Sequence, residues 1–149
     1  MKLLLSMGLF TALGPLAFAG EIKINIQDLP PAVQSAMRAQ TNGATILGAS
    51  KEREDGRMTY EVETRLNNKG RDLTFAEDGT LLEVEQEVNL DSLPQRAQEA
   101  IRMRAGAGTI KKIESVAQGA HISYEAEFIR DGKNREIAVN ADGSPHKED

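Results

Sequence analysis

The sequence repeats itself at a constant offset of 64 residues, and this repetition constrains the fold more than any other feature. Slid against itself by that distance, the chain aligns without a gap. The matching segments are Leu29-Pro30 with Leu93-Pro94, Tyr60-Glu61 with Tyr124-Glu125, and Asp78-Gly79 with Asp142-Gly143. Solenoids need about three or more repeats, and only two copies occur here. The sequence therefore predicts a single duplication.

Each copy begins with an amphipathic helix and continues with strands. Leu29, Val33 and Met37 recur at helical spacing. The period then changes to two, so that Tyr60 and Val62 alternate with acidic residues, which is typical of a strand with one wet face. Gly, Asn and Asp clusters form turns between four predicted strands, at about 44–54, 57–67, 71–77 and 80–88.

A sheet with one apolar face must cover that face, and the helix can do so. We therefore predict an α+β fold of two tandem α-β-β-β-β repeats, each a helix packed on a four-stranded antiparallel sheet. Repeat 1 would span 22–88 and repeat 2 would span 89–149, with its last strand truncated near Pro145. The alternation of Ile22, Ile24 and Ile26 also predicts a short strand ahead of the first helix.

The N-terminus has the pattern of a secretory signal peptide over residues 1–19. Lys2 precedes an uncharged apolar stretch that closes on Ala17-Phe18-Ala19, which predicts cleavage after Ala19. The alternative, a membrane anchor, is disfavoured because the stretch is shorter than the ~20 residues that span a bilayer. We expect a periplasmic or secreted bacterial protein without a membrane anchor after cleavage.

Composition argues against several classes of function. The chain has 18 basic and 23 acidic residues, a net charge of −5, whereas a nucleic-acid binder needs a basic surface. It has no cysteine, so a thiolate nucleophile and a lipoprotein anchor are excluded. His121 and His146 have no accompanying nucleophile motif. We therefore predict no enzymatic activity, no catalytic residue, no metal site and no cofactor.

Strand parity gathers acidic residues on one face of the predicted sheet, away from Tyr60 and Val62. The candidate partner-binding residues are Glu61, Glu63, Arg65, Glu125, Glu127 and Glu136. By the same parity Asp72, Glu83 and Glu85 join them. A plainer interpretation is that exposed strands carry charge for solubility and against aggregation. The doublet Lys111-Lys112 is expected to be a solvated edge.

The pattern resembles the tandem PepSY-like domain family of exported bacterial proteins, whose arrangement is similar to that of the beta-lactamase inhibitory proteins. The motifs that carry the resemblance are Leu29-Pro30 and Leu93-Pro94 at the helix starts, 60–63 and 124–127 in the second strands, and the two Asp-Gly turns. The resemblance implies an extracytoplasmic, non-enzymatic domain that inhibits or shields a secreted partner. In the inhibitor type the sheet face opposite the helices is the binding surface.

The leading hypothesis is an exported binding module that inhibits or shields a periplasmic peptidase or another protein through the helix-free sheet face. Its partner would be an unknown extracytoplasmic protein with a basic surface, not a nucleic acid. The alternative is a small-ligand or divalent-cation-binding periplasmic protein that uses the acidic sheet face, since clustered carboxylates suit such cations. A third hypothesis is self-association at the frayed edge of the second copy.

Overall fold

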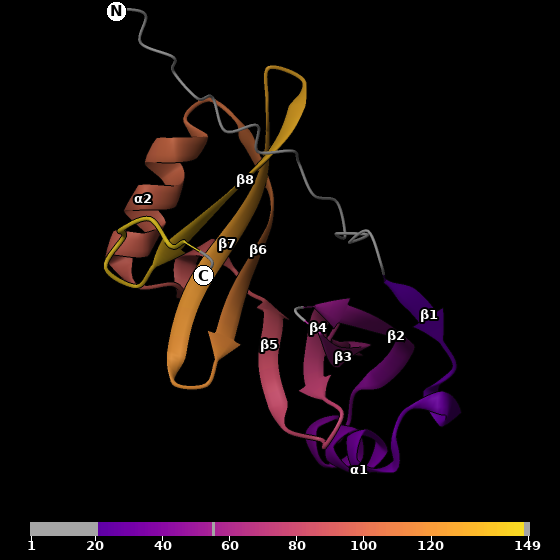
Figure 1. The fold of residues 1–149 in the computed structure, drawn as a ribbon. Helices are drawn as coiled ribbons and strands as arrows, with labels where there is room; N and C mark the ends of the chain where they lie inside the picture. Colours follow the sequence, from indigo (N-terminus) through magenta and orange to yellow (C-terminus); the bar gives the residue numbers. More distant parts are fainter. Residues whose placement is uncertain (1–20, 55, 148–149) are drawn as a thin grey trace, which may run out of the picture.

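A computed structural model of the chain describes residues 21–54 and 56–147. The predicted signal peptide, residues 1–19, lies outside the described residues. The described part is mostly β and holds eight strands, two α-helices and two short 3-10 helices (Figure 1).

In each half a helix is followed by strands, four in the first half and three in the second. The first half contains β1 (Ile22–Ile24), η1 (Ile26–Asp28), α1 (Pro31–Gln40), β2 (Thr45–Glu54), β3 (Arg57–Leu66), β4 (Lys69–Ala76) and β5 (Leu81–Glu87). The second half contains η2 (Leu90–Ser92), α2 (Gln95–Ala105), β6 (Thr109–Gln118), β7 (His121–Arg130) and β8 (Lys133–Asn140). The short strand expected from the isoleucine alternation is β1, which pairs with β2.

The prediction of two tandem α-β-β-β-β repeats, each with its own four-stranded sheet, is wrong. All eight strands form one antiparallel sheet in the order β1-β2-β3-β4-β5-β6-β7-β8. The joint lies between β5 and β6, where Glu83 pairs with Gln118 and Glu87 with Glu114. A sheet edge exposes unpaired N–H and C=O groups, and pairing β5 with β6 removes an edge from each half.

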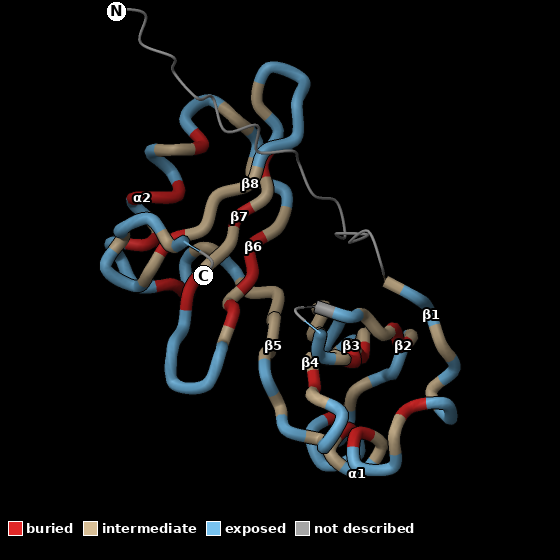
Figure 2. Tube along the Cα trace, in the orientation of Figure 1, coloured by how far each residue is buried: buried red, intermediate tan, exposed pale blue. Residues whose placement is uncertain are grey.

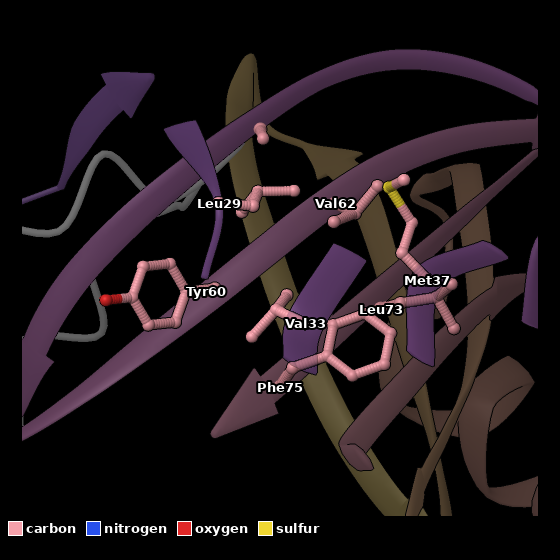
Figure 3. Packing of buried hydrophobic residues seen from close by; sticks show 8 residues of the cluster. Leu29, Val33, Met37, Tyr60, Val62, Leu73 and Phe75 are labelled. Carbon is pink, nitrogen blue, oxygen red and sulfur yellow. The ribbon is translucent and has the colours of Figure 1, made fainter. Parts of the chain in front are cut away.

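Each helix nevertheless covers its own part of the sheet with its own apolar cluster. In the first half Val33 and Met37 of α1 pack with Val62, Leu73 and Phe75, as Figure 3 shows. In the second half α2 packs on β7 and β8. The buried residues of that second cluster are Leu93, Ala97, Ala100, Ile101, Ile113, Ala126 and Val139. Burying these side chains stabilises the fold by about 25 cal/mol per Å² of apolar surface.

The helices leave the middle of the sheet and its opposite face uncovered. In Figure 1 α1 and α2 lie at separate ends, with β5 between them. Figure 2 shows buried positions where each helix meets its strands, and exposed positions at the hairpin tips. After β8 the chain turns at 141–144, and Pro145 forms an isolated bridge with Val139.

Candidate functional site

The candidate site is the helix-free face of the sheet, defined by the carboxylates that alternate with the core residues. On β3 the core residue Val62 lies between Glu61 and Glu63 in sequence, so both carboxylates point to the opposite face. Strand pairing then places Glu63 beside Asp72, and Asp72 beside Glu85. Three carboxylates therefore form a row across β3, β4 and β5.

The joint between β5 and β6 extends this face into the second half of the chain. Glu87 pairs with Glu114, and Glu114 pairs with Glu125. Further along, Glu127 pairs with Glu136 on β8. The two acidic groups expected on separate sheets therefore share one surface, because β5 and β6 are neighbours.

The structure places all six predicted residues on the helix-free face. Glu61 and Glu63 are half-buried, as are the three glutamates of the second half. Arg65 is exposed and lies opposite Gly70, near the end of β3. It therefore sits at one end of the face and not among the carboxylates.

Burial and mutual repulsion shift the protonation of the central carboxylates. Burial, reinforced by the charges of Asp72, Glu21, Glu63 and Glu83, raises the pKa of Glu61 to about 7. The neighbours of Glu85 are Glu83, Glu114, Glu125 and Glu61, and burial together with these charges raises its pKa to about 8. Burial also raises the pKa of Asp72, although its oxygen accepts a hydrogen bond from the Thr64 N–H.

Protons are therefore held on this face near neutral pH. A cation brought to the face would favour the charged carboxylates and displace those protons.

Lys112 is a partner that sequence reasoning placed wrongly. Its Nζ lies 2.7 Å from Glu114 Oε1, and the Glu114 side chain is 11% exposed. Burial alone would lower the pKa of Lys112, but the hydrogen bond to Glu114 and the nearby Glu127 and Asp72 raise it. Lys112 therefore supplies a counter-charge to Glu114 on a central strand, with 38% of its side chain exposed, and does not lie at an edge of the sheet.

A β-bulge in β6 is the reason that residue alternation does not predict the face on which Lys112 lies. The β6–β7 register shifts between Ile110 and Lys112, so Lys111 is the extra residue. Simple alternation from Ile110 assigns Lys112 to the helix side, whereas the bulge turns it to the opposite face. The same shift occurs between Ile46 and Gly48 in β2, again at the 64-residue offset.

His121 is the first residue of β7, and His146 lies beside β8 after the turn at 141–144. The rings of His121 and His146 stack with centroids 5.0 Å apart. His146 Nδ1 lies 3.0 Å from Asn140 Oδ1, and its backbone N–H donates to the Ala138 carbonyl. The contacts with Asn140 and Ala138 hold the C-terminal segment against β8, and the ring stack joins it to the start of β7.

Among the described residues, no group of three or more His, Asp or Glu side chains could hold a metal ion. Within the same ranges, no helix is long and apolar enough to cross a membrane.

Solved structures share this fold. A protein from Bacteroides eggerthii DSM 20697 that is assigned to the periplasm has a TM-score of 0.66 and 15% identity, covering 79% of this chain and 86% of that chain. A DUF2874 family protein from Bacteroides ovatus ATCC 8483 has a TM-score of 0.63 and 17% identity, covering 79% and 84%. A BLIP-like protein from Bacteroides fragilis NCTC 9343 has a TM-score of 0.59 and 16% identity, covering 79% and 83%.

These likenesses extend over most of each chain at low sequence identity, so they show the fold alone. No protein-family model matches the chain, and no curated protein matches it in sequence. The chain therefore has a fold shared with DUF2874 and BLIP-like proteins, which confirms the likeness of fold to the beta-lactamase inhibitory proteins and leaves the PepSY-like family a prediction.

Proposed function

We propose that the chain is an exported, non-enzymatic binding module that presents its helix-free sheet face to a basic surface of an extracytoplasmic protein. The fold shared with a protein assigned to the periplasm and with a BLIP-like protein supports this proposal. So does the signal-peptide pattern of residues 1–19.

One observation carries the proposal: the carboxylates of both halves gather on the sheet face that neither helix covers. Burial, reinforced by repulsion from neighbouring carboxylates, raises the pKa of Glu61 to about 7 and of Glu85 to about 8, so charging these groups on the free face is opposed by desolvation and mutual repulsion. A partner that supplies Lys or Arg side chains relieves that repulsion. Solubility alone does not require carboxylates to be half-buried beside one another.

The electrostatic character of the face also determines how binding responds to salt. Charge complementarity acts mainly on the rate of association and on partner choice. Screening shortens the range of these interactions to about 8 Å at physiological ionic strength. Binding should therefore weaken steadily as salt rises.

More specifically, we propose that the module inhibits or shields a peptidase or another protein of the periplasm. A curved sheet can cover a partner's surface without inserting a reactive group, so such a module would act by occlusion. Among the described residues no group of three or more His, Asp or Glu side chains is arranged to hold a metal ion, so the proposal is made for the protein-binding role.

The test is a crosslinking capture from periplasmic extract, followed by an affinity measurement on the captured partner. The Glu61→Lys/Glu125→Lys variant should reduce the affinity at least about tenfold, which corresponds to ~1.4 kcal/mol. The matched control Glu77→Lys/Glu99→Lys changes the net charge equally at exposed positions outside the face. If both variants bind as the wild type does, the surface assignment is wrong.

A further inference from the structure

The sheet has two open edges. The strand at each edge has a counterpart 64 residues away in the sequence, and that counterpart pairs with a neighbour on both of its sides. β1 forms one end of the sheet and β8 forms the other. In an antiparallel sheet an end strand presents unpaired N–H and C=O groups to its outer side. The two ends can therefore be compared with the interior strands that occupy equivalent positions.

β1 occupies the position of β5. Ile22 pairs with Lys51 and Lys23 pairs with Ser50. Adding 64 to these numbers gives the pairs Gln86 with Ser115 and Glu87 with Glu114, which are the pairs that join β5 to β6. The β1–β2 contact is thus a copy of the β5–β6 contact, but among residues 21–54 and 56–147 no strand pairs with the outer side of β1 as β4 pairs with β5.

β8 occupies the position of β4. Ser123 pairs with Asn140 in the second half, and Thr59 pairs with Ala76 in the first, again 64 residues apart. The strand that follows β8 begins in the same way as β5, because Pro145 bridges Val139 as Leu81 pairs with Phe75. Among the described residues, no strand pairs with the outer side of β8 over residues 133–135.

The outer side of β8 therefore corresponds to the side of β4 that pairs with β5. The outer side of β1 corresponds to the side of β5 that pairs with β4. We propose that a second copy of this chain adds its β1 to the outer side of β8, in the register of the β4–β5 joint. Arg71 pairs with Gln86 in that joint. The same register places Arg135 opposite Ile22 and, continued two residues beyond the last pair of that joint, Asn134 opposite Lys23 and Lys133 opposite Ile24 of the second copy.

The edge residues are suited to this contact. Ile22 is 56% exposed although it is a large apolar side chain on a strand, and strand addition would cover it. The segment from Ser144 to His146 runs along β8 only opposite residues 138–140, so it leaves the three proposed positions accessible. β1 and 133–135 of β8 contain no proline or bulge. Lys23, Lys133 and Arg135 place like charges along the contact, which oppose association at low salt and are screened as salt rises.

The association is heterologous, because one end of the sheet meets the other end of the next copy. Such head-to-tail contacts give rings when the rotation closes and open filaments when it does not. In either case the sheet, and with it the acidic face, continues from one copy to the next. A contact of three residue pairs is small, so the assembly should be concentration-dependent.

Disulfide crosslinking tests the register directly, since the chain has no cysteine of its own. Lys23 and Asn134 are both exposed, and the proposed register makes them direct cross-strand neighbours. Opposite residues of an antiparallel pair lie about 4.5–5.5 Å apart at Cα, within the range that a disulfide spans. Within one copy β1 and β8 are at opposite ends of the sheet, so any Lys23→Cys to Asn134→Cys bond joins two molecules.

On mild oxidation the purified Lys23→Cys/Asn134→Cys variant should give a ladder of dimers, trimers and larger species. A mixture of the two single variants should give disulfide dimers of one chain of each kind. The matched control Lys23→Cys/Glu99→Cys pairs two exposed positions that the proposed contact does not bring together, and it should stay largely monomeric. Sedimentation of the wild-type chain should show a mean mass that rises with concentration.

The proposal is overturned if the double variant crosslinks no more than the control, or if the single variants crosslink with themselves as readily as in the mixture. A mass that stays at the monomer value across the concentration range also overturns it. These results are independent of the binding role proposed for the acidic face, because the carboxylates of that face are unchanged in every crosslinking variant.

Discussion

Gly79 lies directly against the backbone of Ala32, so that a Cβ added to Gly79 would stand 2.7 Å from the Ala32 carbonyl oxygen. Gly79 is in the β4–β5 turn and Ala32 is in the first turn of α1. Gly143 stands in the same relation to Arg96 in α2, with a distance of 2.6 Å. Each Asp-Gly turn therefore holds the start of a helix against the sheet, besides reversing the chain.

The Gly79 contact predicts a specific cost of substitution. Gly79 has φ +85°, which alone makes alanine unfavourable by about 1–2 kcal/mol. The clash with Ala32 should add about 1–3 kcal/mol, because the atom in the way belongs to backbone. Urea unfolding of Gly79→Ala measures the sum.

The control for this prediction is Gly43→Ala. Gly43 has φ +79°, but a Cβ there would meet nothing within 4 Å. Its substitution should therefore cost only the conformational part. Equal losses of stability for the two variants would show that the Gly79–Ala32 contact does not matter.

The shifted carboxyl groups predict how stability depends on pH. The folded state holds the protons of Glu61 and Glu85 more tightly than the unfolded chain does, because both pKa values are raised from 4.5. The free energy of unfolding should therefore fall as the pH rises from about 4.5 to about 8, by at most about 1.4 kcal/mol per pH unit for each group. Urea unfolding at pH 5, 6.5 and 8.5 measures the slope.

Glu85→Gln should remove part of this slope. The variant should be more stable than the wild type at pH 8.5, where the wild-type carboxylate is charged, and should differ little from it at pH 5. Glu99→Gln on the exposed side of α2 is the control and should leave the slope unchanged. A wild-type free energy of unfolding that rises between pH 5 and pH 8 would contradict the raised pKa values of Glu61 and Glu85.

The Lys112–Glu114 pair predicts a third effect. Lys112→Met leaves the buried Glu114 beside other carboxylates without its cation, which should cost about 1–3 kcal/mol of unfolding free energy. Lys111→Met changes the exposed neighbour at the bulge and should have little effect. Adding Glu114→Gln to Lys112→Met should restore most of the loss, and a double variant as unstable as the single one would argue against the pairing.

The single sheet predicts cooperative unfolding of the two halves. Phe75→Ala in the first cluster and Ile101→Ala in the second remove fully buried side chains, at a cost of about 2–5 kcal/mol each. Each substitution should lower the midpoint temperature of one shared unfolding transition, because the β5–β6 pairing joins the two clusters through one sheet. Calorimetry that resolves two transitions in either variant would indicate independently folding halves.

Much of the local structure could be predicted from the sequence. The alternation around Tyr60 and Val62 located β3 and put Glu61 and Glu63 on one face, and the Asp-Gly pairs located turns. The β5–β6 pairing could not be predicted, since α2 separates these strands and alternation does not identify a strand's partner. The bulge at Lys111 hid the place of Lys112 for a related reason, because an extra residue inverts the parity that the prediction depends on.

The central claim is that the helix-free acidic face binds a basic partner, and one comparison tests it most directly. It is the dissociation constant of the captured partner for Glu61→Lys/Glu125→Lys against that for Glu77→Lys/Glu99→Lys, with folding of both checked by circular dichroism. We predict binding at least about tenfold weaker for the first variant and unchanged for the second. Equal affinity in the two variants, or an equal loss in both, would contradict the claim.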